Sequence, residues 1–374
     1  MTTLFDPLKL GDIEISNRVA MAPLTRNRSP KAIPNDLNVT YYEQRAGAGL
    51  IITEGTPVTQ QGQGYADVPG LYLPQAVDGW KKVTEAVHAR GGRIVTQLWH
   101  VGRVSHVSLQ PDGAAPVAPS PVPAGGKTYI INADGSGEFT ETSAPRALEI
   151  SEIAGIVDDF RKAARAAVDA GFDGVEIHGA NGYLIDQFLK TGANQRTDEY
   201  GGSVENRSRF LLQVVDAVSH EIGSGRTGIR LSPTTPANGI ADADPQTIFN
   251  YVAEQLAGRK LSFIHVIEGA TGGDRGHQYE GAAFDYEAFK AAYRNAGGTA
   301  GWMVNNGYDR ETAMQAIASG HADMVSFGRL FIANPDLVKR LKTGVALNEP
   351  DRSTFYGGGA KGYTDYPSLQ AAAA

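Results

Sequence analysis

The stretch Gly174-Val-Glu-Ile-His-Gly-Ala-Asn-Gly-Tyr-Leu184 decides the fold of this chain. Its first residues, 174–177, predict a short buried strand, and the glycine-rich turn that follows carries His178, Asn181 and Tyr183. In a parallel barrel, the loops after the strands point into one shared mouth. There, imidazole and amide donors beside a phenol can hold a substrate oxygen and deliver a proton. Taken alone, the turn also fits a buried structural histidine and a packing tyrosine, so the rest of the chain must decide.

Seven other short apolar runs resemble this strand. The eight predicted strands span 18–21, 50–54, 93–99, 174–177, 227–231, 261–267, 301–304 and 323–327. Amphipathic helices are predicted at 79–89, 151–170, 205–222 and 247–256. Capping signals mark three helix starts: Ser151, Asp244 before Pro245, and Asn334 before Pro335. Eight strand–helix units with nearly continuous apolar strands predict an α/β protein, a single (β/α)₈ TIM barrel domain over residues 1–374.

A doubly wound sheet is the structural alternative. It would need a glycine-rich phosphate turn after the first strand, where this chain reads Ala22-Pro-Leu-Thr-Arg26. Two G-x-G-x-x-G matches, at 223–228 and 357–362, lack the strand-then-helix context. The segment of about 104–150 is longer than any connection that a minimal barrel needs. Its candidate strands, 127–131 and 138–140, predict a cap over the barrel mouth that contains a β-hairpin.

Composition narrows the possible partners and chemistry. The 374 residues carry a net charge of −7 without a basic run, which argues against nucleic acid and anionic membranes as partners. The absence of cysteine excludes disulfides, iron–sulfur clusters and a cysteine nucleophile, and is compatible with the cytoplasmic location that we expect. The N-terminus has no basic region followed by an apolar stretch, so we expect no signal peptide.

Polar residues gather at the carboxyl ends of the predicted strands, where a barrel places its active site. Arg230 is the most informative, because a buried guanidinium requires an anionic partner. That partner is either a bound anion or, as the alternative, a structural ion pair with Glu54 or Glu268. The strand-end residues are Thr25, Glu54, Gly55, Gln97, Trp99, His178, Asn181, Arg230, Glu268, Asn305, Asn306, Gly307, Gly328 and Arg329.

The ends of the last two strands predict a phosphate site. Asn306-Gly307 and Gly328-Arg329 supply backbone amides and a cation at the place where barrels usually bind phosphate. Either pair alone also fits an ordinary strand ending in glycine, but both together favour a phosphorylated cofactor or substrate. Metal binding is poorly supported because His178 lacks a second ligand at suitable spacing. No G-x-S-x-G motif suggests a serine hydrolase.

Ordered motifs extend over nearly the whole chain. They are Asn17-Arg-Val-Ala-Met-Ala-Pro-Leu-Thr-Arg26, Gly62-Gln-Gly-Tyr65, Gln97-Leu-Trp-His-Val-Gly-Arg103, His178-Gly-Ala-Asn-Gly-Tyr-Leu184, Gln187-Phe-Leu189, 194–207, Asn305-Asn-Gly307, Phe327-Gly-Arg329 and 354–359. Together these motifs resemble the Old Yellow Enzyme family of FMN-dependent ene-reductases. Within it, the chain most resembles the bacterial branch that includes nitrate-ester and pentaerythritol tetranitrate reductases.

The resemblance implies a non-covalent FMN. Arg230 would face the N1–O2 edge of the reduced flavin, Gln97 would bind the pyrimidine side, and Thr25 would donate to O4. The other implied cofactor residues line the ring or hold the phosphate: Ala22, Pro23, Leu24, Gly55, Asn305, Asn306, Gly307, Gly328 and Arg329.

The resemblance also implies a ping-pong reaction. NAD(P)H would reduce the flavin and leave, and hydride would then pass from N5 to the β-carbon of an enone, enal, nitroalkene or maleimide. His178 and Asn181 would hold the nicotinamide amide first and the substrate oxygen later, and Tyr183 would protonate the α-carbon. Tyr65, Trp99 and Tyr356 would shape the substrate pocket. Reductive denitration of nitrate esters is a further implied activity.

Other interpretations stay open at this stage. A barrel lyase or aldolase acting on a phosphorylated small molecule would need a strand-end lysine or a metal, and neither is found at the predicted strand ends. A non-catalytic flavin or ligand-binding protein would not need the donors and the phenol. Some family members carry His at the position of Asn181, which leaves the substrate range open. We expect a monomer or weak homo-oligomer.

Overall fold

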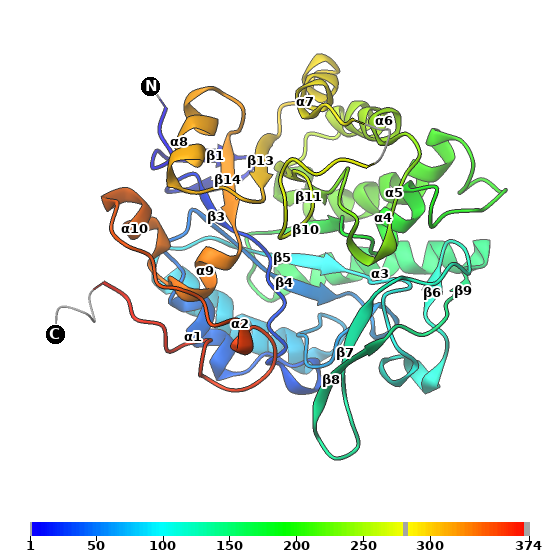
Figure 1. The fold of residues 1–374 in the computed structure, drawn as a ribbon, viewed down its shortest axis with the longest axis horizontal. Coiled ribbons are helices and arrows are strands. Elements are labelled where there is room, and N and C mark those ends of the chain that lie inside the picture. Colours follow the sequence, from blue (N-terminus) through cyan, green and yellow to red (C-terminus); the bar gives the residue numbers. More distant parts are fainter. Residues whose placement is uncertain (1, 280–282, 370–374) are drawn as a thin grey trace.

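The computed structural model describes residues 2–279 and 283–369, in which eight parallel strands close into a barrel (Figure 1). The barrel strands are β3 (Val19–Met21), β4 (Leu50–Pro57), β5 (Ile94–Trp99), β10 (Gly174–Gly179), β11 (Thr227–Leu231), β12 (Phe263–Ile267), β13 (Gly301–Asn305) and β14 (Met324–Phe327). They pair in chain order, and β14 returns to pair with β3. All eight predicted strands and the (β/α)₈ barrel are confirmed.

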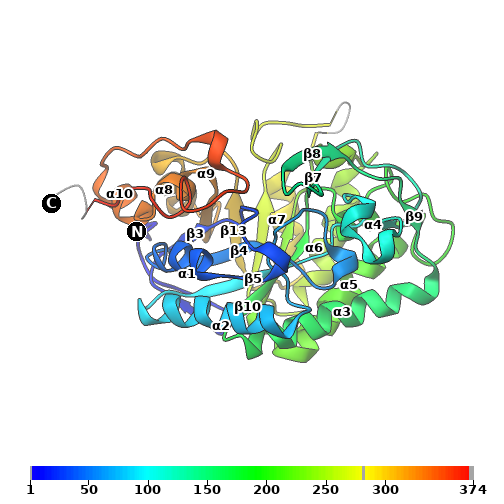
Figure 2. The ribbon, with the colours of Figure 1, turned by 90° about the horizontal axis from the view of Figure 1, so that it is seen from below.

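Helices surround the barrel. They are α1 (Asp36–Glu43), α2 (Pro74–Ala89), α3 (Ile150–Asp169), α4 (Leu184–Leu189), α5 (Val204–Ile222), α6 (Pro245–Ala257), α7 (Tyr286–Asn295), α8 (Arg310–Ala318), α9 (Arg329–Ala333) and α10 (Leu337–Thr343). Figure 2 shows α2 and α3 side by side on the outside of the barrel. Because helices cover the outer face and side chains fill the inside, the strands are buried on both faces and are mostly apolar. No helix in the described ranges is long and apolar enough to cross a membrane.

Two of the three predicted helix caps are wrong. Asp244 does cap α6, since its carboxylate accepts a hydrogen bond from the Thr247 N–H at 3.1 Å. Ser151 lies inside α3, because the Glu152 side chain accepts from the Glu149 N–H at 2.8 Å and the helix begins at Ile150.

Asn334 ends one helix and does not begin the next. Its side-chain amide donates to the Leu330 carbonyl at 2.9 Å, which closes the last turn of α9. The next helix, α10, starts three residues later, after Asp336.

A hairpin that the sequence analysis missed closes the amino-terminal end of the barrel. Its strands, β1 (Leu8–Leu10) and β2 (Ile13–Ile15), pair antiparallel. Leu10, Ile13 and Ile15 are buried against inward-facing residues of the barrel strands. This end is therefore filled by apolar side chains, and chemistry is confined to the opposite end.

The long insertion contains the expected hairpin, formed by β7 (Lys127–Ile131) and β8 (Gly137–Glu141). A short parallel pair, β6 (Val117–Ala118) with β9 (Arg146–Ala147), closes the base of the insertion. Phe139 of β8 packs edge-on against Tyr356, at 5.6 Å between ring centroids. The hairpin thus meets the carboxy-terminal segment at the mouth of the barrel.

Candidate active site

A cavity of about 1180 Å³ opens at the carboxyl ends of the barrel strands. It collects most of the residues predicted from the sequence: Ala22, Pro23, Leu24, Thr25, Tyr65, Asn181, Tyr183, Arg230, Asn305, Asn306, Gly307, Gly328, Arg329 and Tyr356. The four other predicted site residues, Gly55, Gln97, Trp99 and His178, are buried at the same strand ends and are not part of its wall. Lys127, Phe139, Thr271 and Ser326 also line the cavity and were not predicted.

Arg230 is a buried cation without a carboxylate partner among the described residues. Its Nη2 donates to Asn305 Oδ1 at 2.7 Å, and its Nε has no hydrogen-bond partner. Burial lowers the pKa of the guanidinium to about 10, so it stays charged at neutral pH. Neither carboxylate of the proposed ion pair contacts it: Glu54 binds the Arg26 N–H and Tyr42, and Glu268 binds Tyr308 and His321. A bound anion is therefore the partner that fits Arg230.

A polar chain crosses the inside of the barrel beside Arg230. Gln97 Nε2 donates to Glu176 Oε1 at 2.7 Å, and Glu176 Oε2 lies 2.6 Å from His265 Nδ1. The other ring nitrogen of His265 lies 2.7 Å from Ser326 Oγ, which reaches the cavity wall. This chain fixes the amide of Gln97. Its inner members Glu176 and His265 are each flanked on both sides by apolar residues of their strands, and this pattern is visible in the sequence.

His178 presents one defined nitrogen to its surroundings. Its Nδ1 accepts a hydrogen bond from the Ala180 N–H at 3.3 Å. Burial holds the pKa of the imidazole well below its usual value, and the nearby Arg230 lowers it further. The ring is therefore neutral, and because Nδ1 accepts, the proton resides on Nε2. His178 is a neutral hydrogen-bond donor.

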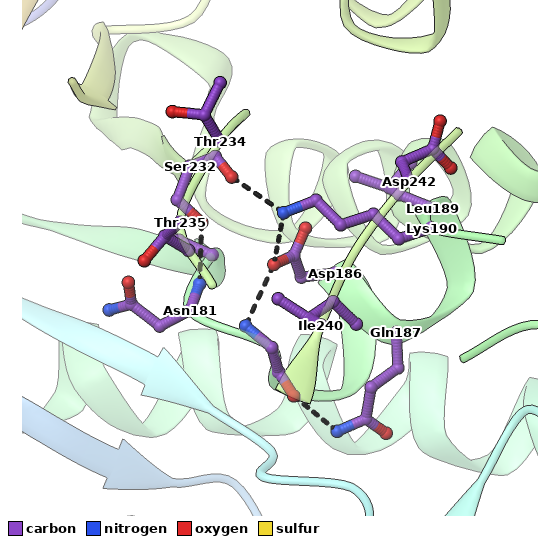
Figure 3. Close-up of polar contacts among 12 residues, drawn as sticks. Asn181, Asp186, Gln187, Leu189, Lys190, Ser232, Thr234, Thr235, Ile240 and Asp242 are labelled. Atoms are coloured by element: carbon purple, nitrogen blue, oxygen red, sulfur yellow. Dashed lines mark hydrogen bonds and ion pairs between the residues drawn. The ribbon is translucent and has the colours of Figure 1, made fainter. Parts of the chain in front are cut away.

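Asn181 is also held with its donor group free. Its backbone adopts the left-handed region with φ 60°, a conformation that asparagine tolerates better than most residues. Its backbone N–H donates to Ser232 Oγ at 2.8 Å (Figure 3). Its Oδ1 accepts from Thr271 Oγ1 at 2.6 Å. The remaining group, Nδ2, can donate to a ligand in the cavity.

Tyr183 keeps its proton at neutral pH. Burial raises the pKa of the phenol well above its usual value, and Tyr65 raises it further. The two hydroxyl oxygens lie 3.3 Å apart. The Trp99 indole stacks on Tyr65 at 5.6 Å and meets Tyr183 edge-on at 4.9 Å between centroids. Tyr183 is thus a protonated phenol fixed by aromatic neighbours.

Gly55 has a steric role beside this aromatic group. A Cβ on Gly55 would overlap the Trp99 indole ring. The glycine therefore lets β4 pass close to β5 at the place where the pairing register shifts between Ile52 and Gly55.

The opposite side of the cavity suits a phosphate. Asn306 Nδ2 donates to the Glu268 and Ala270 carbonyls at 2.7 and 2.9 Å, which fixes the turn after β13. Gly307 follows with φ 68°, and only a distant side-chain carbon lies near its missing Cβ. Arg329 is exposed at the start of α9 and has no carboxylate partner in the described part of the chain. The guanidinium of Arg329 and the uncrowded backbone at Gly307 are therefore both accessible to an anionic group.

These observations fit a flat cofactor with a phosphate tail. The unpartnered Nε of Arg230 and the free guanidinium of Arg329 provide two positive groups in one cavity. The same cavity is also lined by Ala22, Pro23, Leu24 and Thr25. FMN has an anionic ring edge when reduced, and it has a terminal phosphate, so the donor set matches both ends of it.

The comparisons with known proteins agree with this fit. Residues 3–348 match the model of the NADH:flavin oxidoreductase / NADH oxidase family. A putative 12-oxophytodienoate reductase 5 of Oryza sativa subsp. japonica is 47% identical, and the match covers 96% of this chain and 92% of that protein. The 12-oxophytodienoate reductase 2 of Arabidopsis thaliana is 45% identical over 99% of this chain and 96% of its own length.

Solved structures show the same relationship. Morphinone reductase in complex with tetrahydroNAD is 49% identical, with a TM-score of 0.92, and the match covers 99% of this chain and 98% of that one. The Old Yellow Enzyme homologue of Zymomonas mobilis is 41% identical, with a TM-score of 0.92 and coverage of 98% and 100%. This chain accordingly belongs to the NADH:flavin oxidoreductase family of the Old Yellow Enzyme type, whose members are FMN-dependent oxidoreductases.

Proposed function

We propose that this protein is an NAD(P)H-dependent FMN ene-reductase that acts on electron-poor alkenes by a ping-pong reaction. The observation that carries the proposal is one cavity lined by the guanidinium of Arg230, the side-chain amide of Asn181 and the protonated phenol of Tyr183. The neutral donor His178 is buried beside this cavity, with its ring centroid 5.0 Å from that of Tyr183. Enones, enals, nitroalkenes and maleimides all present an acceptor oxygen conjugated to the double bond that is reduced.

The cofactor would be held by residues at both ends of the cavity. In this proposal Arg230 and Gln97 bind the pyrimidine edge, Thr25 donates to O4, and Ala22, Pro23, Leu24 and Gly55 lie along the ring. Asn305, Asn306, Gly307, Gly328 and Arg329 hold the phosphate. FMN when bound would supply hydride transfer from the nicotinamide donor to the substrate carbon.

His178 and Asn181 would bind the oxygen of the ligand. Each has its acceptor atom occupied within the protein, by the Ala180 N–H and the Thr271 hydroxyl, so each offers only N–H groups. A nicotinamide carboxamide and later a substrate carbonyl or nitro group both provide the required acceptor oxygen. Hydrogen bonds to that oxygen become stronger as negative charge accumulates on it, and they therefore lower the barrier to attack at the β-carbon.

Tyr183 would supply the proton to the α-carbon. A phenol whose pKa lies above its usual value remains protonated at neutral pH, and it can donate to a carbanion-like carbon, which is a stronger base. The 3.3 Å contact with the Tyr65 hydroxyl gives the proton a neighbouring oxygen from which it can be replaced.

The remaining assignments complete the proposal. Tyr65, Trp99 and Tyr356 shape the substrate pocket, and the insertion 104–150 caps it through the β7–β8 hairpin, within one domain of residues 1–374. Reductive denitration of nitrate esters is proposed as a second activity, because a nitrate ester also presents acceptor oxygens to the two donors. A cytoplasmic location and a monomeric or weakly associating state are part of the same proposal.

The test separates the two half-reactions. We expect Tyr183→Phe to slow alkene reduction by about 10²-fold or more, because general acid catalysis is lost, and to leave flavin reduction by NADPH within about twofold. Stopped-flow absorbance of the flavin band follows both steps. Equal losses in both steps would exclude the proton-donor role. A colourless protein that does not bind added FMN would refute the oxidoreductase function and favour the barrel lyase.

A further inference from the structure

The backbone of the turn at Asn181 is anchored from several sides. The Gly182 N–H donates to Asp186 Oδ2 at 2.9 Å, and the Asn238 side-chain amide donates to the Asn181 carbonyl at 2.8 Å. Asp186 pairs with Lys190 at 3.1 Å, and both side chains are fully buried. Lys190 also donates to the Ser232 carbonyl at 2.8 Å, as Figure 3 shows. The turn itself is therefore fixed.

The side chain of Asn181 retains one freedom that these anchors do not control. Rotation about the terminal torsion exchanges Oδ1 and Nδ2, and this exchange converts the amide from a donor to an acceptor toward the cavity. No anchor of the backbone distinguishes the two orientations. A contact to the amide group itself must decide between them.

Thr271, on the loop after β12, provides such a contact. Its backbone N–H donates to Thr235 Oγ1 at 3.2 Å, and the Thr235 hydroxyl donates to Thr271 Oγ1 at 3.1 Å. The Thr271 hydroxyl then donates to Asn181 Oδ1 at 2.6 Å. Because the Thr235 hydroxyl gives its proton to Thr271 Oγ1, the single hydroxyl proton of Thr271 is directed at the amide oxygen of Asn181. This relay of hydrogen bonds ends on the amide oxygen and leaves Nδ2 free.

We propose that Thr271 is a positioning residue that fixes the amide orientation of Asn181, so that the turn offers N–H groups to the ligand oxygen. The effect on ligand binding rests on the proposed function, because a flipped amide would direct a lone pair at the carbonyl or nitro oxygen. The hydrogen bond from Thr271 to Asn181 is independent of that function. Thr271 acts through Asn181, although it also lines the cavity.

The first experiment uses free phenol as a small ligand whose oxygen can accept from the donors of the turn. Its binding to the FMN-loaded enzyme is measured by spectral titration. Thr271→Val keeps the shape of the side chain and removes the donor, and we expect it to weaken phenol binding by about 5- to 10-fold. Thr271→Ser restores the hydroxyl and should bind within about twofold of wild type. In an Asn181→Ala background, Thr271→Val should have no further effect. An unchanged affinity in Thr271→Val, or an undiminished effect in the Asn181→Ala background, would overturn the proposal.

The second experiment does not depend on catalysis. In ¹⁵N-asparagine-labelled holoenzyme without phenol, the Asn181 side-chain NH₂ resonance is assigned by its absence in Asn181→Ala. We expect Thr271→Val to shift or broaden this resonance and Thr271→Ser to preserve it. An identical resonance in Thr271→Val would overturn the positioning role. Failure of the wild-type enzyme to bind phenol would count against the proposed function alone, and the resonance would still test Thr271.

Discussion

Removal of the Arg230 charge should stabilise the FMN-free protein and weaken its affinity for FMN. Arg230 is 5% exposed, and among the described residues its guanidinium makes one hydrogen bond, to Asn305 Oδ1. A hydrogen bond to a charged group contributes about 1.5–3 kcal/mol, whereas burial of an uncompensated charge costs several kcal/mol. The charge of Glu176 raises the pKa of Arg230 and so offsets part of that cost, but burial outweighs it. For Arg230→Met we therefore expect the free energy of unfolding of the FMN-free protein to rise by about 1–4 kcal/mol. The same variant should bind FMN at least tenfold more weakly.

Thermal unfolding with and without FMN, together with fluorescence titration of FMN, measures both effects. Arg207→Met is the matched control, because Arg207 is also buried but pairs with Asp242 at 2.8 Å. Loss of one partner of a buried pair costs about 3–5 kcal/mol, so this control should destabilise the protein. If Arg230→Met also destabilised the FMN-free protein, the guanidinium would already be compensated internally, and our reasoning about a missing anion would be wrong.

Three further outcomes are expected. Lys190→Met should lower the free energy of unfolding by about 3–5 kcal/mol, because Asp186 loses its partner. Lys190→Met/Asp186→Leu should recover only part of this loss in urea unfolding, because the Gly182 N–H then loses its acceptor. Gly55→Ala should displace the Trp99 ring and cost about 1–3 kcal/mol, measurable by near-ultraviolet circular dichroism and thermal unfolding. Burial raises the pKa of Glu54 to about 7, so its stabilising contribution is present below about pH 4.5 and is lost as the pH rises through 7. A Glu54→Gln variant should lack this loss of stability. If its melting temperature depended on pH in the same way as that of the wild type, the role of Glu54 would be contradicted.

The sequence predicted the strands and their polar ends because both signals are local. A run such as 301–304 is apolar on both faces, and polar residues follow directly in the chain. Parallel topology then places all strand ends at one edge, so the chemistry at Asn181 and Arg230 could be expected to lie in one cavity. The boundaries were less accurate at Ser151 and Asn334. At the first, the neighbouring Glu152 side chain accepts from the Glu149 N–H, and at the second, the Asn334 side chain bonds back to the Leu330 carbonyl.

The partners of these residues could not be predicted, because they are distant in the chain. Thr271 lies 90 residues from Asn181, on the loop of another strand. His265 lies 89 residues from Glu176 and meets it only because the barrel closes. Loops carry no periodic pattern that reports such contacts. The sequence therefore indicated which groups could donate, and only the structure shows which of their atoms are already occupied.

That distinction determines what the cavity can bind. Histidine and asparagine each carry an acceptor atom, and in this protein a backbone N–H and a threonine hydroxyl occupy those two atoms. Arg230 has no acceptor, and Tyr183 retains its proton. Most of the polar groups that we propose to contact the flavin ring or the substrate are therefore hydrogen-bond donors. Such a set favours ligands that present acceptor oxygens on which negative charge can accumulate. A carbonyl, a nitro group and a nicotinamide carboxamide share that feature, which is why we propose that one set of donors serves both half-reactions in turn.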